Sequence, residues 1–288
     1  MNDGDDKPLH AVSPDRTVLD DSRDDEDIVA EVADDLGDEV DEALDSASPT
    51  RRARLRKRGV YLLPNLITTG ALFAGFYAIV AGMNGNFLPA ALAIFVAMAL
   101  DTADGRVARL TNTQSQFGAE YDSLSDMVAF GVAPALVAFS WGLSTLGKAG
   151  WVVTFVYMAC AALRLARFNT KGDNSSFTGL ASPSAAAIIA CCVWVWVEYV
   201  GGAPSIFAAS IMGAITVVTG LLMVSNFTYY SPKFINFKGR VPFVTLVFIV
   251  LGFSIMLIDP PTVLLMLFTG YAVSGPAQNA WRRLKHRN

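Results

Sequence analysis

The sequence predicts an all-α integral membrane protein with about eight transmembrane helices and a disordered acidic N-terminal tail. Of the 288 residues, 53% are hydrophobic and only 17% are charged, which is too apolar for an ordinary water-soluble enzyme. The net charge of -4 conceals a division, because residues 1–48 hold 18 of the 26 acidic residues but three of the 22 basic ones. The rest of the chain is therefore basic, and it contains the long apolar runs.

The first predicted region, residues 1–48, is the acidic tail. Its most acidic stretch, from Asp3 to Asp45, contains no aromatic residue. Such a segment cannot bury enough apolar surface to offset the entropy lost on ordering, so we expect it to be disordered. A secretory signal peptide is excluded, because that would need a basic start and an apolar centre.

The second region, residues 49–65, is a basic juxtamembrane segment. Six Arg and Lys residues fall between Arg51 and Arg58, shortly before the uncharged run Leu66–Met83. As a helix, this run crosses about 27 Å of hydrocarbon at a rise of about 1.5 Å per residue. We therefore expect the basic cluster to lie on the anionic cytoplasmic face of a membrane, and we expect no nucleic-acid partner.

The third region, residues 66–288, is predicted to be a multi-helix membrane domain. Seven further apolar segments follow the first run, at 87–108, 122–146, 149–167, 183–200, 204–225, 241–258 and 261–280. With eight helices and a cytoplasmic N-terminus, Lys148 is the one basic residue after the tail that falls on the outer side. The sequence thus predicts an integral plasma (inner) membrane protein with both termini in the cytoplasm.

Carboxylates gather at one place in the membrane domain. Only eight occur after the acidic tail, and five of them lie between residues 101 and 126. Asp101 and Asp104 are three residues apart, so they share one face of a helix. Asp122 and Asp126 are four residues apart and do the same. The polar connection Leu110–Phe117 is short enough to make the two helices antiparallel neighbours, so we expect the four carboxylates to converge.

Four carboxylates in a small volume repel one another unless cations neutralise them. Oxygen ligands suit divalent cations such as Mg²⁺ or Mn²⁺, and two such ions are a known device for displacement at phosphorus. Gly105 and Gly118 leave room for a bulky ligand beside the backbone, and Arg109 can offer forked donors to a phosphate. These residues predict a site, at the cytoplasmic ends of the helices, for a phosphate-containing substrate and two divalent cations.

The residues from Asp101 to Asp126 fit the pattern D-x2-D-G-x2-A-R-x8-G-x3-D-x3-D at every fixed position. This pattern resembles the signature of the CDP-alcohol phosphatidyltransferase family, whose fold and homodimeric state the resemblance implies. The family's metal-ligand positions correspond to Asp101, Asp104, Asp122 and Asp126, and Asp126 also corresponds to the general base. The positions around the CDP group correspond to Gly105, Ala108, Arg109, Gly118 and, in the segment that opens the first membrane helix, Asn65.

Two later segments, Leu163–Asn169 and Phe177–Ala186, resemble the serine-using branch of this family, although Ala181 stands where that branch usually has Pro. The resemblance implies transfer of the phosphatidyl group from CDP-diacylglycerol to the hydroxyl of L-serine, with release of CMP among membrane lipids. Arg164 and Arg167 are then candidates to bind the serine carboxylate or a lipid phosphate.

Other functions fit parts of this pattern. The same chemistry with another acceptor alcohol, such as glycerol 3-phosphate or inositol phosphate, would use the same signature. An ion-coupled membrane transporter could use the acidic residues as an ion site, but the two halves of the chain show no convincing inverted repeat. A non-catalytic membrane scaffold would have no use for the complete signature.

Overall fold

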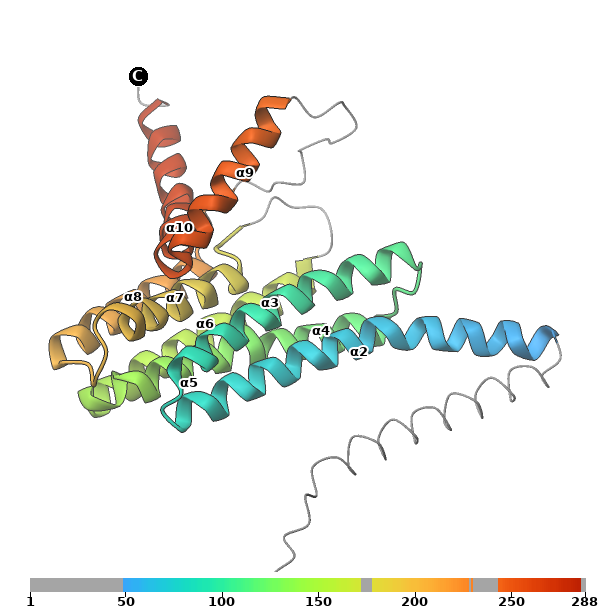
Figure 1. The fold of residues 1–288 in the computed structure, drawn as a ribbon, viewed down its shortest axis with the longest axis horizontal. Coiled ribbons are helices and arrows are strands. Elements are labelled where there is room, and N and C mark those ends of the chain that lie inside the picture. Colours follow the sequence, from blue (N-terminus) through green and yellow to red (C-terminus); the bar gives the residue numbers. More distant parts are fainter. Residues whose placement is uncertain (1–48, 172–177, 228, 230–242, 286–288) are drawn as a thin grey trace, which may run out of the picture. The chain divides into compact units, whose positions relative to one another are not determined.

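The structure is a computed structural model that describes residues 49–171, 178–227, 229 and 243–285. The regular elements in this part of the chain are helices (Figure 1). The predicted acidic tail, residues 1–48, lies outside the described residues, so its disorder stays a prediction. The chain divides into two units, Met1–Arg58 and Gly59–Asn288, and the second contains every predicted site residue.

The helices follow one another closely along the chain. In order they are α2 (Pro49–Met83), α3 (Phe87–Leu110), α4 (Gln116–Asp126), the π-helix η1 (Met127–Val132), α5 (Ala133–Trp141), the short 3₁₀ helix η2 (Leu143–Leu146), α6 (Lys148–Lys171), α7 (Ser182–Tyr199), α8 (Ile206–Val224), α9 (Phe243–Ile258) and α10 (Pro260–Lys285). The predicted basic segment, residues 49–65, forms the first part of α2. Among the described connections, the one between α2 and α3 is a short turn at Gly85, whose φ of 78° suits glycine.

Six helical segments among the described residues are long and apolar enough to cross a membrane. They are Leu63–Met83, Phe87–Leu110, Gln116–Trp141, Lys148–Thr170, Ser182–Tyr199 and Ile206–Val224. A seventh span results if α9 and α10, which meet at a bend of 120°, are counted as one. The all-α membrane fold predicted from the sequence is confirmed, whereas the predicted number of eight helices was approximate. The difference lies in α9 and α10, because the described part of α9 has only 16 residues, fewer than the about 20 that a membrane span needs.

Small residues bring the helices of the second unit close together. Ala78, Ala90, Ala97 and Ala133 are fully buried between neighbouring helices. An added Cβ at Gly75 of α2 would lie only 2.8 Å from the Cα of Ala129 in η1. Close backbone approach of this kind is typical of membrane helices, where lipid offers no hydrophobic drive for association.

Helix α7 packs against both α3 and α10, and α6 runs along α8 (Figure 1). Large apolar side chains such as Phe73, Trp151 and Phe155 remain exposed on the outer faces, as expected for contact with lipid. This packing fixes the ends of α3, α4 and α6, where the predicted site residues lie.

Candidate active site

The turn between α3 and α4 brings two pairs of carboxylates to one end of the bundle. Asn112 adopts a left-handed φ of 54°, and the hydroxyls of Thr111 and Thr113 lie 2.7 Å apart. Ser115 then caps α4, because its Oγ accepts a hydrogen bond of 3.0 Å from the backbone N–H of Gly118. The predicted polar connection is therefore a tight five-residue turn.

Three of the four predicted carboxylates form a cluster, which with Asp104 we call the carboxylate end. Ligand oxygens of Asp101, Asp122 and Asp126 all lie within 4.8 Å of one another, and the three side chains are half-buried. The Oδ1 atom of Asp122 is buried and has no hydrogen-bond partner among the residues that the structure describes. A buried carboxylate oxygen without a partner, beside two further carboxylates, suits a divalent cation that takes oxygen ligands.

Asp104 lies beside this cluster and makes a different contact. It is only 4% exposed, and its Oδ2 accepts a hydrogen bond of 2.7 Å from the hydroxyl of Thr68 in α2. The backbone oxygen of Thr68 accepts a hydrogen bond of 3.2 Å from the hydroxyl of Ser125 in α4. Thr68 thus joins α2, α3 and α4 at one buried point. Neither Thr68 nor Ser125 was predicted from the sequence to belong to the site.

Arg164 of α6 faces the carboxylate end. Its Nη1 donates a hydrogen bond of 2.6 Å to the hydroxyl of Ser182, the fully buried first residue of α7. Its guanidinium also interacts electrostatically with Asp126. The Arg164 guanidinium is therefore close enough to influence the charge of the carboxylate predicted to be the general base, although the structure shows no direct hydrogen bond between the two among the described residues.

Arg167, one turn later on α6, binds the backbone instead. Its Nη1 donates to the carbonyl oxygen of Val224 at 3.0 Å, and its Nη2 donates to that of Thr178 at 2.8 Å. Longer contacts reach Met223 O, Ser225 O and Asn226 Oδ1. The guanidinium thus ties the end of α8 to the segment before α7, whereas the sequence suggested a substrate contact.

Gly179 completes this arrangement. Its φ is 88°, and an added Cβ would lie 2.2 Å from Met223 O and 2.8 Å from Arg167 Nη2. A larger residue would meet both backbone strain and a clash, so the close approach requires glycine. The backbone N–H of Gly179 also donates to Phe227 O at 2.8 Å.

The residues predicted to surround the CDP group lie on the same helix ends. Gly105 is exposed, and an added Cβ there would meet no atom within 4 Å. An added Cβ on Gly118 would lie 3.4 Å from Asn65 Oδ1, so Asn65 faces Gly118. Arg109 is exposed and its Nε donates to Gly105 O at 2.8 Å, while Ala108 is half-buried. The structure thus brings Asn65 and Gly118 together and leaves Gly105 and Arg109 accessible.

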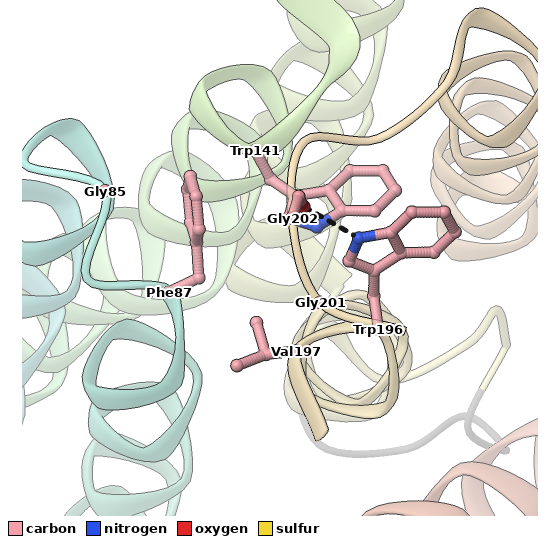
Figure 2. A pocket seen from close by; sticks show the side chains of 7 residues that line it. All are labelled: Gly85, Phe87, Trp141, Trp196, Val197, Gly201 and Gly202. Carbon is pink, nitrogen blue, oxygen red and sulfur yellow. Dashed lines mark hydrogen bonds between the residues drawn. The ribbon is translucent and has the colours of Figure 1, made fainter. Parts of the chain in front are cut away.

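A pocket of about 300 Å³ lies at the other end of the same helices (Figure 2). We call it the aromatic end, and it is lined by Gly85, Phe87, Trp141, Trp196, Val197, Gly201 and Gly202. The Trp141 and Trp196 rings meet edge to face with centroids 5.3 Å apart, and Trp196 Nε1 donates to Gly202 O at 3.2 Å. Its lining contains no ionisable side chain, so the carboxylate end is the better candidate for chemistry.

Comparison with known proteins supports this choice. The sequence model of a family described as CDP-alcohol phosphatidyltransferase matches residues 61–224, which include every predicted site residue. A Helicobacter pylori (strain ATCC 700392 / 26695) protein named CDP-diacylglycerol–serine O-phosphatidyltransferase is 38% identical over 200 residues, covering 67% of this chain and 82% of that protein. The protein of that name from Bacillus subtilis (strain 168) is 40% identical over 124 residues, covering 43% and 70%. Its Methanocaldococcus jannaschii namesake is 37% identical over 161 residues, covering 55% and 71%.

Proposed function

Because the chain belongs to the CDP-alcohol phosphatidyltransferase family, we propose that it transfers the phosphatidyl group of CDP-diacylglycerol to the hydroxyl of L-serine. The products are phosphatidylserine and CMP. The observation that carries this proposal is the convergence of Asp101, Asp122 and Asp126 within the part of the chain that the family model matches. The names of the relatives from three organisms support serine as the acceptor.

The carboxylate end would hold two divalent cations, Mg²⁺ or Mn²⁺. Its proposed ligands are Asp101, Asp104, Asp122 and Asp126. The unpartnered Oδ1 of Asp122 supports this assignment, because a metal ion would satisfy it. When bound, two such cations neutralise pyrophosphate charge and stabilise the charge that develops on the leaving group.

Asp126 is the proposed general base. It would accept the proton of the serine hydroxyl while the serine oxygen forms a bond to the diacylglycerol-linked phosphorus. The bond between that phosphorus and the bridging oxygen breaks, and CMP leaves with the bonding electrons. Asp126 is suited to this role because it belongs to the carboxylate cluster and is subject to the positive charge of Arg164.

Arg164 is the proposed partner of the serine carboxylate. Within the described part of the chain it donates one hydrogen bond, to Ser182, which leaves other guanidinium donors for a substrate. The Arg167 guanidinium, by contrast, already donates to four carbonyl oxygens and the Asn226 side chain. This difference supports Arg164 as the acceptor contact and gives Arg167 a role in holding the fold.

The nucleotide would bind among Asn65, Gly105, Ala108, Arg109 and Gly118. The open space beside Gly105 and the exposed position of Arg109 support this placement. The acyl chains of the donor would stay in the lipid while the nucleotide enters from the cytoplasm.

The test is to supply purified protein with CDP-diacylglycerol, Mg²⁺ or Mn²⁺, and one acceptor at a time. We expect CMP release that depends on L-serine, and little with glycerol 3-phosphate or inositol phosphate. Release with one of the other alcohols but not with serine would contradict the proposed acceptor and keep the reaction type. No release with any alcohol, from protein that binds Mn²⁺, would contradict the reaction itself.

The proposed location is the plasma (inner) membrane, with the carboxylate end and both termini cytoplasmic and with a homodimer as the assembled form. In a variant without the three native cysteines, a cysteine at Thr170 should react with a membrane-impermeant thiol reagent only after the membrane is opened. A cysteine at Asn84 should react in intact cells. The opposite labelling pattern would invert the orientation.

A further inference from the structure

The helix that carries Asp122 and Asp126 changes its winding directly after Asp126. Residues Met127–Val132 form the π-helix η1, and the N–H of Ala133 donates to the carbonyl of Val128, five residues earlier. A π turn holds one residue more than an α turn, and each residue of an α-helix turns the chain by about 100°. The insertion therefore rotates α5 relative to α4 by about that angle.

Pro134 explains why the winding changes here. In an unbroken α-helix the carbonyl of Phe130 would accept the N–H of residue 134, but proline has none and its ring would clash with that carbonyl. Pro134 is fully buried, so water does not replace the missing donor. Tyr157 of α6 replaces it instead, because its hydroxyl donates a hydrogen bond of 3.0 Å to Phe130 O. The Tyr157 side chain is 0% exposed.

Close packing holds the same turn from two sides. On the α2 side, Gly75 lies against the backbone of Ala129, where a Cβ would approach Cα to 2.8 Å. On the α6 side, a Cβ on Gly131 would come within 3.2 Å of Ala161. Both contacts leave little room for the π turn to shift between α2 and α6.

The rotation at η1 allows the apolar face of α5 and the carboxylate face of α4 to point toward the interior of the bundle at the same time. Ala133 and Val137 of α5 are fully buried in the core, while Asp122 and Asp126 of α4 meet Asp101. In an unbroken α-helix with α5 packed as it is, the two carboxylates would turn away from Asp101 by about 100°. The π turn is thus what makes the buried face of α5 compatible with the carboxylate cluster.

We propose that Tyr157 is a positioning residue for Asp126, which acts by holding the π turn through its hydrogen bond to Phe130. The inference rests on the proposed function, because Asp126 matters as a metal ligand and base. Tyr157 also lies two helical turns before Arg164 on the same face of α6. One helix face therefore fixes both the carboxylate and the cation beside it.

The experiment compares Tyr157→Phe with a matched variant, Tyr229→Phe. The Tyr229 hydroxyl is also buried and donates to a helix carbonyl, but its acceptor, Ala272 O at 3.1 Å, belongs to α10 and not to η1. Each variant loses one buried hydrogen bond, so their thermal unfolding midpoints should fall by similar amounts. Mn²⁺ binding is measured without substrates, by the electron paramagnetic resonance signal of free Mn²⁺, together with kcat and the KM for CDP-diacylglycerol.

We expect Tyr157→Phe to weaken Mn²⁺ binding about tenfold, as for loss of a residue that supports metal ligands, and to lower kcat about tenfold. Tyr229→Phe should leave both within twofold. Equal effects in the two variants, or unchanged Mn²⁺ binding in Tyr157→Phe, would overturn the inference. Serine-dependent CMP release by the unmodified protein tests the proposed function separately, so the two failures are distinguishable.

A second pair of variants disturbs the turn from the α2 side, in case Tyr157→Phe does not fold. Gly75→Ala would press on the Ala129 backbone, which cannot yield without moving η1. Gly82→Ala, two turns farther along α2, would meet the side chain of Val137 at 3.1 Å. We expect weaker Mn²⁺ binding in Gly75→Ala only. The same binding in both folded variants would count against a role for the π turn.

Discussion

The carboxylate end and the aromatic end are built from the same helices, yet the surroundings of their buried polar groups are charged at one end and apolar at the other. Each end holds a buried side-chain atom without a hydrogen-bond partner, Oδ1 of Asp122 at one and Nε1 of Trp141 at the other. Asp122 lies among other carboxylates, so its negative charge needs a cation to balance it. Trp141 is uncharged and packs against the ring of Trp196, so no cation is needed there. The aromatic end has a pocket of about 300 Å³ but no ionisable side chain in its lining, which teaches that the chemistry of the side chains, and not the presence of a pocket, indicates the site.

The largest expected effect comes from replacing a carboxylate of the carboxylate end. Asp122→Asn should abolish measurable CMP release and weaken Mn²⁺ binding by at least about tenfold, because it removes an anionic ligand. The same loss is expected for Asp101→Asn and Asp104→Asn. The control is Glu198→Gln, an exposed carboxylate at the end of α7 next to the aromatic end, which should keep full activity. Full activity in an Asp variant would remove that residue from the metal ligands.

Replacing the proposed base should have the next largest effect. Asp126→Asn is expected to lower kcat by a factor of about 10² or more, which is typical for loss of a general base. Binding of CDP-diacylglycerol, measured by equilibrium dialysis, should remain detectable. A variant that loses donor affinity but keeps its turnover would show instead that Asp126 mainly binds the donor.

Replacing the two arginines of α6, Arg164 and Arg167, should affect different properties of the protein. Arg164→Ala is expected to raise the KM for serine about tenfold more than that for CDP-diacylglycerol, because a charged hydrogen bond contributes roughly 1.5–3 kcal/mol. Arg167→Ala should lower the thermal unfolding midpoint and change both KM values equally, since its partners are backbone carbonyls. A serine-selective effect in Arg167→Ala would reverse the two assignments.

The smallest effect is expected at the aromatic end. Trp141→Phe removes the unpartnered N–H and keeps an aromatic ring, so the free energy of unfolding should change by no more than about 1 kcal/mol. The rate of CMP release should stay within twofold. A tenfold loss of rate would show that the aromatic end takes part in the reaction and would break the contrast between the two ends.

Much of the carboxylate end could be predicted because its information is local. Asp101, Asp122 and Asp126 lie within one short pattern, and a tight turn is enough to bring them together. The resemblance of this pattern to the family signature was confirmed by the family match. The roles of the individual residues stay predictions.

What could not be predicted depends on packing between distant segments. The hydrogen bond from Thr68 to Asp104 joins residues 36 positions apart and requires the register between α2 and α3. The partners of Arg167 are main-chain carbonyls, which leave no trace in the pattern of side chains. Pro134 within an apolar run does indicate a local break, but whether the helix kinks, ends or widens is decided by Tyr157 and Gly75.

The contact of Thr68 with both α3 and α4 has a consequence for the response of the protein to its bilayer. Sliding α2 along its axis by even one residue would break the bonds to Asp104 and Ser125 together, so the depth of this helix is fixed at the carboxylate end. At the aromatic end, Gly85, Gly201 and Gly202 lie in exposed turns with no atom within 4 Å of an added Cβ, so these turns have more room than the carboxylate end. A bilayer of different thickness should therefore be accommodated by tilt and by movement of these turns. We expect turnover to vary little with the chain length of the surrounding lipid.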